Sequence, residues 1–129
     1  MSENPTPVQA RTEVSYDEAL KMAIELHRNG QIEGAAQLYE RLLAAAPGHP
    51  DVLHLLGMAR HQMGQSADGI ELIQQAIERE PRFAGFHNNL GNIHMSQGRT
   101  QDATHAYERA IELAPDDADV LRARAAWLE

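Results

Sequence analysis

Histidine is abundant in this chain of 129 residues, and two of its seven histidines could share a metal ion. His27, His61 and Met95 are equally spaced in the sequence, with the same number of residues from each one to the next. If these positions are equivalent on neighbouring packed helices, about 8–10 Å apart, two imidazoles could reach one ion. No carboxylate or third imidazole is clearly placed to complete the coordination shell. The favoured interpretation is therefore a pair of solvated rings and no metal.

Asparagine side chains offer a second kind of chemistry. Asn88, Asn89 and Asn92 lie close together, and a carboxamide can pair with both the N–H and the C=O of a peptide backbone. Such a row could hold an extended chain without reading its sequence. At the same spacing earlier in the chain the row is broken, because Lys21 and Leu55 replace Asn89, and Ile24 and Met58 replace Asn92.

Catalytic chemistry has no comparable signal, because the chain lacks a nucleophile elbow, a phosphate-binding glycine loop and a zinc-protease helix. Without cysteine it has neither a disulfide framework nor a thiolate metal site. The net charge of −8 argues against binding to nucleic acid or to anionic membrane. No secretory signal is present, and no apolar run reaches the roughly 20 residues of a membrane span. We expect a soluble cytoplasmic protein that is not an enzyme and holds no cofactor.

The same spacing is the period of a sequence repeat, because the glycines and prolines that end helices also recur at it. Glycine and proline each recur three times at this spacing, which predicts three copies of a two-helix unit with a glycine in the middle turn and a proline near the end. Large apolar residues recur in the same register and are expected to form the core. The three sets are Gly30, Gly64 and Gly98; Pro47, Pro81 and Pro115; and Met22, Leu56 and Leu90 with Tyr39, Ile73 and Tyr107.

The same period predicts the organisation of the chain. Ser15 begins the first helix, with Glu18 three places on in a capping-box pattern. A flexible tail is expected before it, and a final helix after the last unit. The predicted segments are a tail at 1–14, a domain at 15–129 with repeats at 16–49, 50–83 and 84–117, and a capping helix at 118–129.

The third unit carries a recognisable motif in Leu90-Gly91, Gly98, Tyr107 and Pro115. With this spacing the chain resembles the tetratricopeptide repeat family over residues 16 to 117. The resemblance implies an all-α fold, a right-handed superhelix of three helix-turn-helix repeats closed by a capping helix, seven helices in all. It also implies a concave groove, lined by the first helix of each unit, that binds a protein or peptide.

The register assigns the side chains that face this groove. Four of them, Leu20, Ile24, Leu55 and Met58, are apolar, and we interpret them as a slot for a partner side chain. Alternatively the N-terminal tail covers them, or a second copy of the chain covers them in a homo-dimer. They could also face away from the groove. The predicted partner-binding residues are Leu20, Lys21, Ile24, His27, Arg28, His54, Leu55, Met58, His61, Asn88, Asn89, Asn92 and Met95.

Three functions are compatible with this interpretation. The first is a non-catalytic scaffold for protein binding, and the second is a self-assembly module. A third is the substrate-recognition domain of a larger transferase, because residues 88–92 are similar to the repeats that precede the catalytic part of N-acetylglucosaminyl protein transferases. Trp127 lies in a helical pattern without a stop signal, which is the pattern expected of a fragment. The carboxylate clamp of chaperone co-factors is not expected, since among the equivalent positions only Asn89 fits it.

Overall fold

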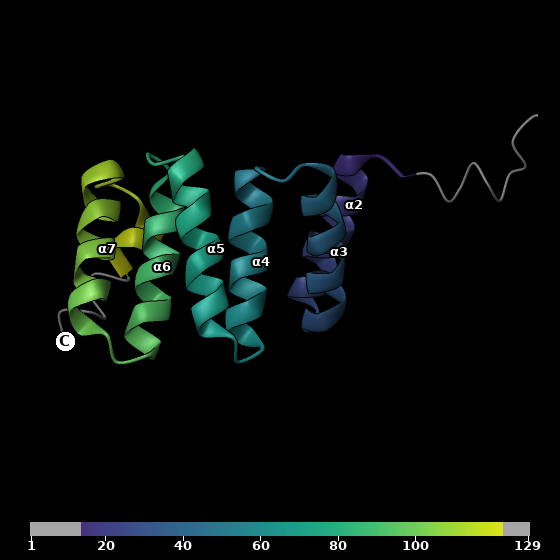
Figure 1. The fold of residues 1–129 in the computed structure, drawn as a ribbon. Coiled ribbons are helices and arrows are strands. Elements are labelled where there is room, and N and C mark those ends of the chain that lie inside the picture. The colour runs from purple at the N-terminus through teal and green to yellow at the C-terminus, as the bar shows by residue number, and fades with distance from the viewer. Residues whose placement is uncertain (1–13, 123–129) are drawn as a thin grey trace, which may run out of the picture.

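The protein is an array of helices, seen in a computed structural model that describes residues 14–122. Each helix contacts the next, and Figure 1 shows the pairs following one another from α2 and α3 at one end to α6 and α7 at the other. The described residues contain no strand, so the predicted all-α fold is confirmed. The helices are α2 (Tyr16–Arg28), α3 (Ile32–Ala45), α4 (Pro50–Gln62), α5 (Ser66–Arg79), α6 (Ala84–Ser96) and α7 (Thr100–Leu113), and a seventh begins at Ala118.

The signals that predicted the helix ends act as expected. Ser15 Oγ accepts the backbone N–H of Glu18 at 3.1 Å and so caps α2. The middle turns contain Gly30, Gly64 and Gly98 with φ of 84°, 85° and 73°, a left-handed conformation that favours glycine. The second helices end shortly before a proline, since proline cannot donate the next backbone hydrogen bond.

The three helix pairs lie within 16–49, 50–83 and 84–117, and two clusters of buried side chains join them. Tyr39 and Ile73 are fully buried, and Tyr107 is 4% exposed. The seventh helix is anchored by Val120, which is 3% exposed. Most of the predicted tail and the later part of the capping helix lie outside the described residues. None of the described helices has the length and hydrophobicity that crossing a bilayer requires.

The prediction that Met22 belongs to the core is wrong, because its side chain is 51% exposed. The equivalent residues Leu56 and Leu90 are buried, each against helices of its own and the preceding unit. Met22 lies on the first helix of the array, so no second helix of an earlier unit covers it among the described residues. Its exposure follows from its position at the end of a one-dimensional stack.

In the second unit the two helices approach until their backbones touch. A Cβ atom on Gly57 would lie 2.8 Å from the carbonyl oxygen of Gly69, and one on Gly69 would lie 2.5 Å from that of Gly57. In the third unit Gly91 faces instead the ring of Tyr107, 2.6 Å from where a Cβ would stand. Glycine is therefore needed in both units, but for different neighbours.

Candidate functional site

Side-chain contacts join successive first helices, and three of the predicted groove residues take part in them. His27 on α2 contacts Gln62 on α4, and His54 on α4 contacts Asn89 on α6. The two pairs have the same separation in sequence, so the contact repeats with the architecture. A continuous surface therefore runs across α2, α4 and α6.

The two histidines that obey the period are both engaged within the fold. His27 Nδ1 lies 3.0 Å from the Tyr39 hydroxyl, and its Nε2 contacts Gln62. His61 Nδ1 lies 2.8 Å from Ser66 Oγ at the start of α5. Across residues 14–122 no group of three histidine, aspartate or glutamate side chains could hold a metal ion. Each imidazole therefore has a partner in its own unit, and His27 also contacts the next unit.

His54 lies on α4, the middle of the three first helices, and is half-buried. Its ring stands 4.9 Å from that of Phe86, and Nε2 accepts the amide N–H of Asn89 at 2.7 Å, which leaves the ring proton on Nδ1. Burial lowers the pKa of His54 from 6.5 to about 4; the carboxylate of Asp51 opposes this change, and His27 adds to it. The ring is therefore neutral at physiological pH.

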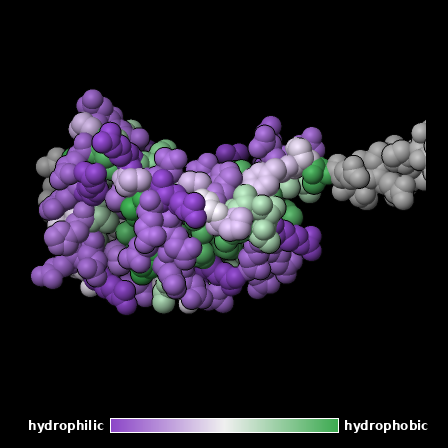
Figure 2. Space-filling view, turned by 45° about the horizontal axis from the view of Figure 1, so that its top comes forward, coloured by the Kyte–Doolittle hydropathy of each residue, from purple (hydrophilic) through white to green (hydrophobic). Residues whose placement is uncertain are grey.

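The four apolar groove residues are half-buried and not fully exposed. Leu20, Ile24 and Leu55 pack against the first core cluster, and Met58 against the second. Figure 2 shows a mainly hydrophilic surface in which hydrophobic side chains appear in the furrows between ridges. Each apolar residue therefore contributes a part of its surface to the core, and its role toward a partner stays a prediction.

Three further predicted residues, Lys21, Arg28 and Met95, lie on α2 and α6. Lys21 and Arg28 are exposed, and Arg28 forms a long ion pair of 3.9 Å with Glu25 on its own helix. Met95 near the end of α6 is half-buried. An exposed ion pair of this kind contributes little to stability, and the role of both cations toward a partner stays a prediction.

The three asparagines differ in what they bind. Asn92 Oδ1 accepts the hydroxyl of Tyr107 at 2.6 Å, so its amide nitrogen is left as a donor. Asn89 gives an N–H to His54. Asn88 is 8% exposed, and its Oδ1 is buried without a hydrogen-bond partner among the described residues. An unpaired buried acceptor is costly, so Asn88 calls for an explanation.

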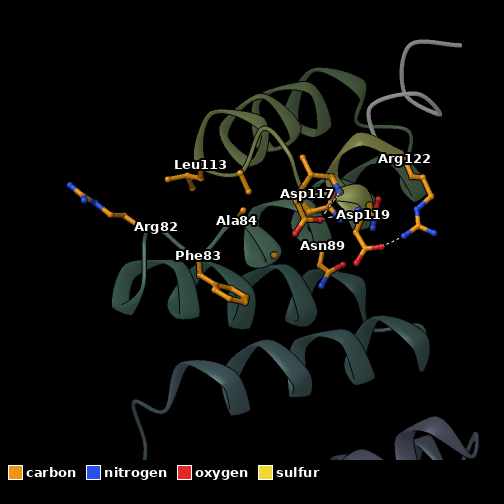
Figure 3. Close-up of a pocket in the computed structure, with 13 residues that line it drawn as sticks. Arg82, Phe83, Ala84, Asn89, Leu113, Asp117, Asp119 and Arg122 are labelled. Carbon is orange, nitrogen blue, oxygen red and sulfur yellow. Dashed lines mark hydrogen bonds and ion pairs between the residues drawn. The ribbon is translucent and has the colours of Figure 1, made fainter.

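A cleft of about 720 Å³ lies at this end of the groove, between α6 and the start of the seventh helix. In Figure 3 Asn89 faces Asp117 and Asp119 across the opening, Phe83 lies on the α6 side, and Arg82 extends away. Asn88 also lines this cleft. The other lining residues are Ala84, Gly85, Asn92, Leu113, Ala114, Val120 and Arg122.

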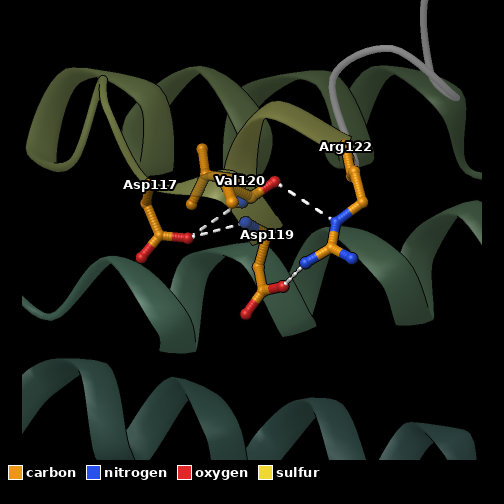
Figure 4. A network of polar contacts seen from close by, with 5 residues as sticks. Asp117, Asp119, Val120 and Arg122 are labelled. Atoms are coloured by element: carbon orange, nitrogen blue, oxygen red, sulfur yellow. Dashed lines mark hydrogen bonds and ion pairs between the residues drawn. The ribbon is translucent and has the colours of Figure 1, made fainter.

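The charges on the far wall of the cleft are engaged locally. Asp117 Oδ1 accepts the backbone N–H groups of Asp119 at 2.9 Å and Val120 at 3.2 Å, and so caps the seventh helix. Arg122 pairs with Asp119 and donates from Nε to the carbonyl of Ala118 at 3.4 Å (Figure 4). This wall therefore carries two carboxylates and one guanidinium, and Arg82 adds the second cation of the cleft lining.

Sequence reasoning assigned groove positions to the three units only, and so missed the wall that the seventh helix provides. The available signal was the period itself. One further step places Asp119 in the register of Asp17 and Asp51, and Asp117 in the register of Phe83.

Stacked helix pairs with a shared concave surface define a helical-repeat protein. Sequence models of the tetratricopeptide repeat match residues 17–59, 54–118 and 90–128. The chain belongs to the tetratricopeptide repeat family. No curated protein sequence matches it.

Several solved structures share this fold. The type III secretion chaperone SycD of Yersinia enterocolitica, in complex with a peptide of the translocator YopD, is 16% identical with a TM-score of 0.77, and the match covers 87% of this chain and 86% of that one. The Sgt2 TPR domain of Aspergillus fumigatus is 21% identical with a TM-score of 0.80, over 96% and 79% of the two chains.

A third similar structure is that of an enzyme. A mutant of the O-GlcNAc transferase of Thermobaculum terrenum is 28% identical with a TM-score of 0.79. The match covers 87% of this chain but only 21% of that chain, so this chain corresponds to about a fifth of the transferase.

Proposed function

We propose that this chain is a non-catalytic protein-binding scaffold that holds an extended peptide or a partner helix in its concave groove. The observation that carries the proposal is the continuous surface across α2, α4 and α6, joined by the His27–Gln62 and His54–Asn89 contacts. Parallel helices of a solenoid form an elongated concave surface that suits an extended ligand. The similar fold of a chaperone that was solved with a peptide supports the same conclusion.

The groove offers two kinds of contact along its length. Half-buried Leu55 and Met58 present apolar surface in the middle, and Asn89 and Asn92 present carboxamides toward the C-terminal end. Methionine adapts its shape to different side chains, and a carboxamide can satisfy backbone groups of a bound chain. A partner with apolar side chains at one end and accessible polar groups at the other would match both.

The experiment compares partner capture by the wild type with that by the double variant Leu55→Glu and Met58→Glu. Captured proteins are identified, and synthetic peptides from them are titrated against both forms. The control is Gln74→Glu with Gln75→Glu, which adds the same charge at exposed positions of α5. We expect the groove variant to lose about tenfold or more in peptide affinity while the control keeps it. Equal affinities in all three proteins would remove the groove from the proposal.

A second candidate function is substrate recognition within a larger transferase. The 28% identity to the O-GlcNAc transferase and the asparagines of α6 favour it. Its test is the reading frame after Glu129. A transferase domain encoded in frame would support this function, and a stop codon at that point would refute it.

A further inference from the structure

The start of α6 departs from the other first helices in the array. Ser15, His49, Phe83 and Asp117 occupy the same register in successive units, and each is the residue before a helix. Ser15, His49 and Asp117 accept backbone N–H groups with their side chains, whereas Phe83 makes no capping hydrogen bond. Phe83 instead exposes 53% of its surface beside the cleft.

This departure leaves hydrogen-bond donors at the cleft. The first N–H groups of a helix have no partner within it, and a capping side chain ordinarily accepts one of them. Phe86 donates to the Phe83 carbonyl at 3.2 Å, but Ala84 and Gly85, which both line the cleft, receive no side-chain cap from Phe83. Gly85 replaces the aspartate of the other units, and the Phe83 ring packs over it, because a Cβ atom on Gly85 would lie 2.8 Å from that ring.

The next turn of α6 contributes Asn88, which also lines the cleft. Asn88 is more than nine-tenths buried, and its Oδ1 has no partner in the described part of the chain. The cleft therefore combines uncapped helix donors with an acceptor that is unpaired within residues 14–122. A ligand group that supplies one N–H and one C=O would satisfy both.

Charge decides which group this is. α6 carries no lysine, arginine, aspartate or glutamate. On the opposite wall Asp119 is paired with Arg122, and Asp117 caps its own helix. Arg82 and Arg122 together offset the charges of Asp117 and Asp119, so the described lining has no net charge. A neutral polar group is therefore favoured over an ion, because an ion would lose hydration without meeting a net opposite charge.

We propose that this cleft binds a carboxamide side chain, asparagine or glutamine, of the peptide held in the groove. The carboxamide N–H donates to Asn88 Oδ1, its oxygen accepts from the first-turn N–H groups of α6, and its methylene groups lie on the Phe83 ring. The inference rests on the proposed function and adds the partner's chemistry at one end of the groove.

The test uses isotope-labelled full chain and four small probes with identical backbones, the N-acetyl N-methylamides of glutamine, norleucine, glutamate and lysine. Binding is followed by NMR at the Asn88 side-chain amide and the Gly85 backbone amide, and an asparagine probe then separates the two carboxamide sources. We expect glutamine or asparagine to bind about tenfold more tightly than the other three probes. Equal binding of norleucine would mean apolar contact alone, and tighter binding of glutamate or lysine would mean an ion site; either result overturns the proposal.

Two variants separate recognition from folding. Phe83→Ser supplies a cap that occupies a first-turn N–H, so we expect an intact fold and a loss of the preference for glutamine. Asn88→Leu removes the acceptor, with the same expected loss. The matched control is His49→Ser, the equivalent cap substitution one unit earlier, which should leave the preference unchanged. Equal effects of Phe83→Ser and His49→Ser would refute the assignment.

The probe experiment and the capture experiment can fail independently. Leu55 and Met58 lie on α4 and do not line the cleft. Probe preference with no groove-dependent partner would leave the cleft intact as a site and remove the scaffold function. Groove-dependent capture without probe preference would remove only the present inference.

Discussion

The neutral His54 in the groove predicts that the array loses stability as the pH falls. In the folded state burial holds the pKa at about 4, whereas the unfolded chain titrates near 6.5. Below about pH 6.5 the unfolded chain binds a proton that the folded protein does not bind. The contribution of neutral His54 to the free energy of unfolding is therefore fully present above about pH 6.5. It falls as the pH decreases toward about 4 and changes no further below that value.

The expected magnitude follows from these two pKa values. Between about pH 7.5 and about pH 5.5 the free energy of unfolding should fall by about 1.3 kcal/mol through His54 alone. For a domain of this size the loss corresponds to about 5 °C in the midpoint of thermal unfolding. Protonation of Nε2 would also set a donor against the N–H that Asn89 now gives it at 2.7 Å. His94, whose pKa burial also lowers, acts in the same direction.

The assay compares the wild type with His54→Leu, which introduces the residue found at the equivalent position, Leu20. Urea unfolding of both proteins at the two pH values removes the contributions of His94 and the carboxylates, because these are common to both. When the pH is lowered, we expect the free energy of unfolding of the variant, relative to that of the wild type, to rise by about 1.3 kcal/mol. An NMR titration of the wild type should place the midpoint of His54 near 4. Parallel stabilities of the two proteins, or a midpoint near 6.5, would refute the reasoning.

Four further substitutions test the packing by urea unfolding. Gly57→Ala should lower the free energy of unfolding by about 2 kcal/mol, because its Cβ would lie 2.8 Å from the Gly69 carbonyl. Gly34→Ala should raise it by about 0.5 kcal/mol, because its Cβ would lie 3.7 Å from a leucine methyl. Equal effects of the two substitutions would contradict the close approach of α4 and α5. Asn88→Leu should stabilise by about 1 kcal/mol, because it removes a buried acceptor that is unpaired within residues 14–122, and a loss of stability would show that the oxygen is satisfied. Phe83→Ser should stabilise α6 by up to about 1 kcal/mol through a new cap, and a clear loss would mean that the ring is structural.

The sequence predicted the features that every unit must repeat. A turn between two packed helices needs a left-handed residue, so Gly30 and its equivalents could be assigned from spacing alone. The Ser15 cap and the burial of Tyr39 and Ile73 follow equally from local pattern. These features are predictable because each depends on contacts within one unit or between identical neighbours.

What could not be predicted depends on the ends of the array and on individual partners. Met22 satisfies the core pattern, yet it lacks a preceding helix to cover it among the described residues. Likewise the contact of His54 with Asn89 requires the lateral offset between two first helices, which a period does not contain. The lowered pKa of His54 follows from that packing, so it too became visible only in three dimensions.

The end of the groove also shows how function can be separated from repetition. At the residue before each first helix, the repeat favours a side chain that accepts an N–H, since this stabilises the helix by about 1 kcal/mol. Phe83 gives up that stabilisation, and Asn88 adds the cost of a buried oxygen that is unpaired within residues 14–122, in the same cleft. Two independent departures from stable packing in one place are hard to explain by folding, because either could be removed by a single substitution. A bound partner that pairs with both the donors and the acceptor explains the two departures together. This explanation requires that Asn88→Leu and Phe83→Ser each stabilise the free protein and each weaken probe binding.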